Sequence, residues 1–81
     1  MPYKKILANN LIDFRKSEHI SQYEIAARSD ISRETVSLIE RECANVTLDV
    51  LEKLISYMGI TMPEIFTEDF VKISTFSNEK M

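Results

Sequence analysis

Apolar residues recur at helical intervals along most of this 81-residue chain. Near its start, Leu7, Leu11 and Phe14 follow one another at spacings of four and three residues. This spacing places all three on one face of a helix, which we expect to span about residues 3–17 and to bury that face in a core.

Residues that commonly cap helices predict four further helices after the first. Ser21–Glu24 and Thr61–Glu64 match the capping box, in which a hydroxyl and a glutamate satisfy each other's backbone amides. Ser32 and Thr47 stand at the starts of two more apolar stripes, and Gly59 is placed to end the second of them. The expected helices span about residues 22–29, 33–41, 48–58 and 62–66.

The composition supports a small all-α protein. The chain holds 44% hydrophobic and 28% charged residues, but only one glycine and two prolines, too few for a fold built of hairpins. No apolar run reaches the roughly 18 residues of a membrane span, and the start lacks the pattern of a signal peptide. The single Cys43 excludes an internal disulfide and fits a reducing, cytoplasmic location.

Catalytic chemistry finds little support in the sequence. The lone His19 and scattered carboxylates form no metal-ligand spacing, no nucleophile–base pair and no glycine-rich phosphate loop. We therefore expect no enzyme activity, no metal, no cofactor and no small-molecule ligand.

Residues 22–41 have the spacing of a helix-turn-helix, two helices that cross steeply over a short turn. Ala26 is small enough for a close crossing, and Asp30 is among the few non-glycine residues that readily adopt the left-handed backbone such a turn needs. The second helix would be anchored by its apolar residues, Ile31, Val36 and Ile39.

The stretch from Ser21 to Arg41, SQYEIAARSDISRETVSLIER, resembles the phage-repressor (Cro/XRE) helix-turn-helix family, and the likeness extends over residues 6–66. The resemblance implies a compact five-helix, lambda-repressor-like domain over residues 1–66, with residues 67–81 as a short C-terminal extension. It also implies a transcriptional regulator, most often a repressor, that binds an inverted-repeat operator in double-stranded DNA as a homodimer. Restriction-modification controller proteins and antitoxins share this size and fold, so activation and autoregulation stay open.

The same resemblance implies which residues contact DNA. The third helix would enter the major groove, where the fork of Arg33 matches the guanine edge. Glu40 with Arg15 resembles the family's structural ion pair between the third and first helices. The predicted base contacts are Arg33, Glu34, Ser32, Ser37 and Leu38, and the predicted phosphate contacts are Gln22, Asn45 and Arg41.

Apolar residues near the C-terminus exceed what one small core needs. The stretch that follows Glu68 alternates like a strand but also fits one helical face, so it could pack on its own chain or on a second one. We expect a dimer contact, formed by Met58, Ile60, Phe66, Phe70, Val71 and Ile73.

The charge balance leaves a rival function open. The net charge is −3, and Asp30 and Glu42 add acids where the family commonly has glycine, while Val46 replaces a common proline. An acidic helix-turn-helix with apolar Leu38 on its reading face would also suit a protein-interaction module with little DNA affinity. An apolar patch around Leu38 would favour that alternative.

Overall fold

The computed structural model describes residues 2–68, and every regular element in that range is a helix. The prediction of an all-α fold is therefore confirmed for the described residues, and the helix boundaries agree with the expected ones to within about one residue. The helices are α1 (Tyr3–Glu18), α2 (Gln22–Ser29), α3 (Arg33–Glu40), α4 (Leu48–Met58) and α5 (Met62–Ile65).

Hydroxyl side chains cap four of the five helices, as predicted. The Ser32 hydroxyl accepts the Thr35 amide at 3.0 Å, and the Thr47 hydroxyl accepts the Val50 amide at 3.1 Å. Thr61 forms the complete capping box with Glu64 at the start of α5. These caps satisfy amides that the first turn of a helix leaves without a partner, so they fix where each helix begins.

The capping box predicted at Ser21 is only half formed. The Ser21 hydroxyl accepts the Glu24 amide at 3.0 Å, but the Glu24 carboxylate accepts a hydrogen bond from Arg28 at 2.9 Å instead of reaching back. Arg28 lies one turn further along α2, where a glutamate and an arginine four residues apart are neighbours. The ion pair within the helix thus replaces the second half of the box.

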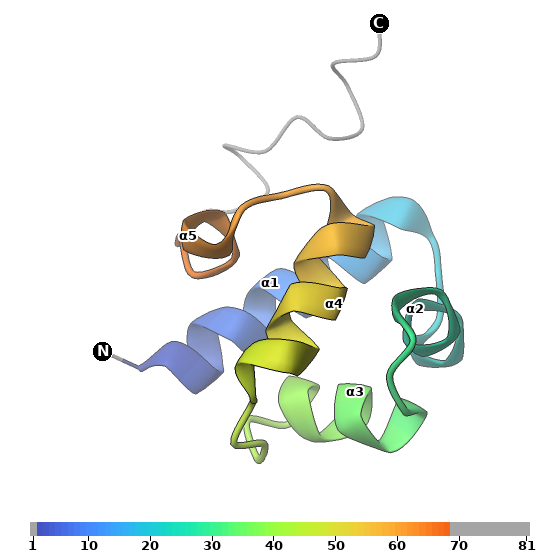
Figure 1. Cartoon of the computed structure of the whole chain (residues 1–81), viewed down its shortest axis with the longest axis horizontal. Coiled ribbons are helices and arrows are strands. Elements are labelled where there is room, and N and C mark those ends of the chain that lie inside the picture. Colours follow the sequence, from blue (N-terminus) through green and yellow to red (C-terminus); the bar gives the residue numbers. More distant parts are fainter. Residues whose placement is uncertain (1, 69–81) are drawn as a thin grey trace, which may run out of the picture.

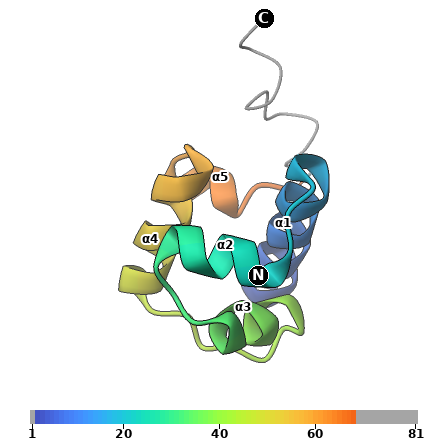
Figure 2. The ribbon, with the colours of Figure 1, turned by 90° about the vertical axis from the view of Figure 1, so that its right-hand side faces the viewer.

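Helices α1 and α4 lie on opposite sides of the molecule, and α2, α3 and α5 close the space between them (Figures 1 and 2). Helix α3 packs against α1 and α2, and α4 packs against α2 and α5. The apolar stripes of all five helices meet in one core, in which the fully buried side chains are Leu7, Leu11, Ile25, Val36, Ile39, Leu54 and Ile65.

The turn between α2 and α3 has the predicted geometry. Asp30 adopts the left-handed conformation with φ 62°, and Ala26 is buried where the two helices approach each other. The amide of Ile31 donates to the carbonyl of Ala26 at 3.0 Å, which closes the end of α2. This turn directs the first turn of α3 to the surface.

A buried asparagine that the sequence did not single out attaches α5 to α1. The Asn10 amide donates to the carbonyl of Ile65 at 2.7 Å and to that of Thr67 at 3.1 Å. Because a four-residue helix has few contacts of its own, these two bonds hold the end of α5 in place.

Candidate nucleic-acid interface

The first turn of α3 is the exposed part of the helix-turn-helix. Ser32, Arg33 and Glu34 are exposed, whereas Val36 and Ile39 on the opposite face of the helix are buried in the core. Figure 1 shows α3 running along one edge of the molecule. An outer helix face of this kind is narrow enough to enter the major groove of DNA.

Arg33 is free to bind a ligand, because its guanidinium forms no ion pair within residues 2–68. It lines a shallow hollow between the first turns of α2 and α3, together with Gln22 and Tyr23. Tyr23 is 70% exposed, and sequence reasoning missed it because an exposed tyrosine in a first helical turn has no distinctive pattern.

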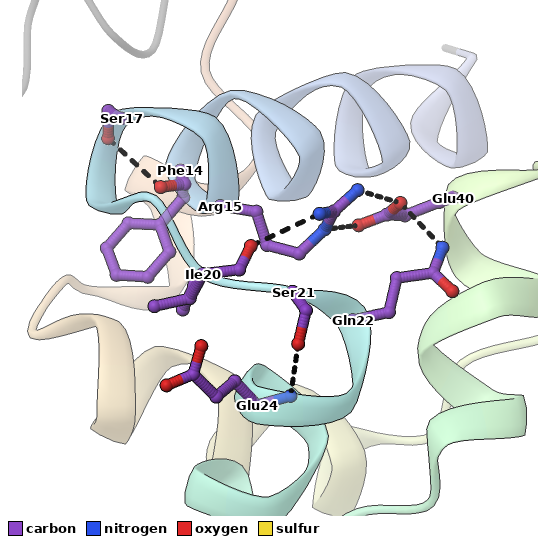
Figure 3. A network of polar contacts seen from close by, with 8 residues as sticks. All are labelled: Phe14, Arg15, Ser17, Ile20, Ser21, Gln22, Glu24 and Glu40. Atoms are coloured by element: carbon purple, nitrogen blue, oxygen red, sulfur yellow. Dashed lines mark hydrogen bonds and ion pairs between the residues drawn. The ribbon is translucent and has the colours of Figure 1, made fainter.

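The predicted ion pair between Arg15 and Glu40 is present and bidentate. Arg15 Nε donates to Glu40 Oε2 at 2.7 Å, and Nη2 donates to Oε1 at 2.9 Å (Figure 3). The Glu40 side chain is only 6% exposed and the Arg15 side chain 19% exposed. The hydrogen bonds to Glu40 raise the pKa of Arg15 above its ordinary value, despite the opposing effect of partial burial.

This ion pair connects three elements. A third nitrogen of Arg15 donates to the carbonyl of Ile20 at 3.2 Å, before α2 begins, and the Gln22 amide donates to Glu40 Oε1 at 3.0 Å (Figure 3). The network therefore fixes α3 relative to both α1 and the first turn of α2. A reading helix that is held in this way presents its side chains in one orientation.

Four of the predicted contact residues are either partly buried or already hydrogen-bonded within the domain. The Ser32 hydroxyl is engaged in the cap and lies 2.8 Å from the Thr35 hydroxyl. Ser37 and Leu38 are only partly exposed, on the part of α3 that approaches the rest of the domain. The Gln22 amide is also in use, because it donates to Glu40. The DNA contacts of these residues stay predictions.

The remaining predicted phosphate contacts lie beyond the end of α3. Arg41 and Asn45 are both exposed, and Arg41 forms no ion pair in the described part of the chain. Between them, Glu42 adopts a left-handed backbone with φ 62°, a conformation that side chains other than glycine, asparagine and aspartate rarely adopt.

Comparison with known proteins identifies the family to which this arrangement of α2 and α3 belongs. Residues 11–65 match the helix-turn-helix family model, a span that includes the whole of α2 and α3. The chain belongs to the Cro/XRE-type helix-turn-helix family. It is a DNA-binding transcriptional regulator.

Named relatives of this regulator include two control proteins. The chain is 32% identical to the control protein C.SmaI of Serratia marcescens over 72 residues, which are 89% of this chain and 86% of that protein. It is 39% identical to the control protein C.MunI of a Mycoplasma species over 61 residues, which are 74% of this chain and 82% of that protein. Among solved structures, the hypothetical transcription factor NHTF from Neisseria superposes with a TM-score of 0.77 at 27% identity, covering 89% of this chain and 85% of that one.

The predicted dimer residues of this helix-turn-helix protein have different surroundings. Met58 is 3% exposed and packs in the monomer core, so its side chain has almost no surface to offer a second chain. Ile60 and Phe66 are half-buried against the same core and keep an accessible edge. The other three predicted contacts, Phe70, Val71 and Ile73, lie outside the described residues.

Residues 2–68 contain neither a metal-ligand cluster nor a membrane-spanning helix. No cluster of three or more histidine, cysteine or acidic side chains in this range could hold a metal ion. None of the described helices is long and apolar enough to cross a membrane.

Proposed function

We propose that this regulator binds an inverted-repeat operator as a homodimer, with the first turn of α3 in the major groove of each half-site. Arg33 reads a guanine through its two terminal nitrogens, and Glu34 accepts from a cytosine amino group. Ser32, Ser37 and Leu38 complete the base contacts, while Gln22, Asn45 and Arg41 bind phosphates. The protein acts as a cytoplasmic repressor without catalytic activity or a small-molecule effector.

The observation that carries this proposal is the exposed, unpaired Arg33 on a helix held by a nearly buried ion pair. A surface arginine that forms no ion pair within residues 2–68 is available for an anionic partner, whereas Arg15, whose guanidinium binds Glu40, is not. The fixed orientation of α3 supports recognition of base edges, which needs side chains placed to within a fraction of an ångström.

The alternative function, a protein-interaction module with little DNA affinity, has less support than DNA binding. An apolar patch around Leu38 would favour this alternative, and Leu38 is only partly exposed. The exposed large apolar residues within residues 2–68 are Tyr3, Tyr23 and Leu48, and none of them lies on α3.

The proposal is tested by selecting from a pool of randomised duplex DNA at low salt and sequencing what binds. We expect an enriched inverted repeat, bound by two chains per duplex when the mass of the complex is measured by analytical ultracentrifugation. Arg33→Ala should change the enriched half-site, whereas Arg28→Ala, which removes an exposed arginine from α2, should leave it unchanged. No enrichment by the folded protein, or one chain per duplex, would contradict the proposal.

A further inference from the structure

The positive charges that take part in no ion pair are unevenly placed over the domain. Of the lysines and arginines in residues 2–68, three form ion pairs: Arg15, Arg28 and Lys53. The others are Lys4, Lys5, Lys16, Arg33 and Arg41. Four of these five belong to α3, to the residue that follows it, or to the first turn of α1.

The first turn of α1 lies against the chain that leaves α3. Pro2, Lys4 and Lys5 line a shallow hollow together with Glu42, which directly follows Arg41. Figures 1 and 2 agree that the N-terminal end of α1 lies near α3, whereas its other end, which carries Lys16, lies at the far side of the molecule. The two lysines therefore lie beside the chain that follows Arg41, beyond the C-terminal end of α3.

These lysines do not contribute to the stability of their own helix. Cations in a first turn oppose the helix dipole, which favours negative charge there. The other described helices each carry an acid in the first turn, Glu24, Glu34, Asp49 or Glu64, whereas α1 has none. Their position is thus unfavourable for α1 itself but suits a negatively charged partner.

From this charge and placement we infer that Lys4 and Lys5 form a second DNA-backbone contact, on a phosphate outside the base pairs that α3 reads. The partner is the sugar–phosphate backbone, because the surface offers positive charge and no fixed array of donors that could distinguish bases. This inference rests on the proposed operator binding and extends the bound length of each half-site. Glu42, in the same hollow, weakens the contact by its negative charge.

The test measures affinity for the selected operator by fluorescence anisotropy over a series of salt concentrations. The variants are Lys4→Gln and Lys5→Gln, singly and together, with Lys16→Gln as the matched control because it removes an equally unpaired lysine from the other end of α1. Losing one phosphate contact per subunit lowers the slope of log affinity against log salt by about 0.9 for each subunit, or about 1.8 for a dimer. At 0.1 M salt, the affinity of the double variant for the operator should therefore be about 60-fold lower than that of the unaltered protein.

Two further measurements separate a backbone contact from a general charge effect. Lengthening the duplex beyond the two half-sites should strengthen binding of the unaltered protein and of Lys16→Gln more than that of the double variant. Glu42→Gln should strengthen binding, because it removes the acid from the same hollow.

The outcomes distinguish this inference from the proposed function. If the double variant keeps the salt slope and the length dependence of Lys16→Gln while the unaltered protein binds its operator, the inference is wrong and the proposed function stands. If the unaltered protein selects no operator, the proposed function fails and the inference fails with it.

Discussion

Replacing Arg15 by methionine tests the structural role of the buried ion pair. Methionine has nearly the volume of the arginine stem but no charge, so Glu40 loses both hydrogen bonds of the bidentate pair. The Glu40 side chain, only 6% exposed beside Arg15, then keeps only the hydrogen bond from Gln22.

The size of the effect follows from this burial. Removing one partner of a buried ion pair costs about 3–5 kcal/mol, because the other charge is left without compensation. The remaining bond from Gln22 places the expected loss near the lower end, at about 3 kcal/mol. A chain of 81 residues has a total stability of about 4–12 kcal/mol, so the variant loses a large share of it. The melting temperature should fall by about 15 °C.

The assay is unfolding in urea, monitored by circular dichroism, and two further variants serve as controls. Arg28→Met breaks the exposed pair with Glu24 and the exposed hydrogen bond to the Tyr57 hydroxyl. It should cost little stability, because solvent screens exposed pairs and competes for exposed hydrogen bonds. The double variant Arg15→Met, Glu40→Met removes both charges and should recover most of the lost stability. An Arg15→Met variant as stable as Arg28→Met, or a double variant that is less stable than Arg15→Met, would refute the reasoning.

Three smaller predictions concern the backbone and the end of α5. Gly59→Ala should lower the free energy of unfolding, measured by urea titration, by about 1 kcal/mol. Gly59 has φ 74° and a new Cβ would meet nothing within 4 Å, so the cost is that of the left-handed backbone alone. An unchanged midpoint of unfolding would contradict this. Glu42→Gly should raise the melting temperature by a few degrees, because glycine adopts the left-handed backbone at φ 62° without the strain that a side chain causes there. A lower melting temperature would show that this backbone is not strained. Asn10→Leu should lower the free energy of unfolding by about 1–3 kcal/mol, because it leaves the buried carbonyl of Ile65 without its donor. Amide hydrogen exchange should then increase first in α5. An equal increase in all helices would count against the role given to Asn10.

The helices could be predicted from the sequence because the signals that define them are local. The hydroxyl caps and the apolar stripes depend on residues within one or two turns of each other, so Ser32 and Thr47 could be assigned without knowledge of the tertiary structure. The left-handed Asp30 was predictable for the same reason, because few side chains tolerate that conformation.

The features that sequence reasoning missed depend on contacts between distant segments. Gln22 could have pointed toward solvent or toward Glu40, and only the position of α3 decides between them. Asn10 has no local signal, because its partner carbonyls belong to residues more than 50 positions away. Met58 was expected at a dimer contact, but the packing of α4 and α5 turns it into the core.

The central claim, that α3 reads DNA through Arg33, is tested most directly by a double-mutant cycle between protein and operator. The affinities of the unaltered protein and of Arg33→Ala are measured for the selected operator and for one in which the guanine assigned to Arg33 is replaced. We predict that either change alone weakens binding by about 1–3 kcal/mol and that the second change then adds little, because both remove the same contact. Fully additive losses, or an Arg33→Ala variant that still discriminates the guanine, would contradict the account.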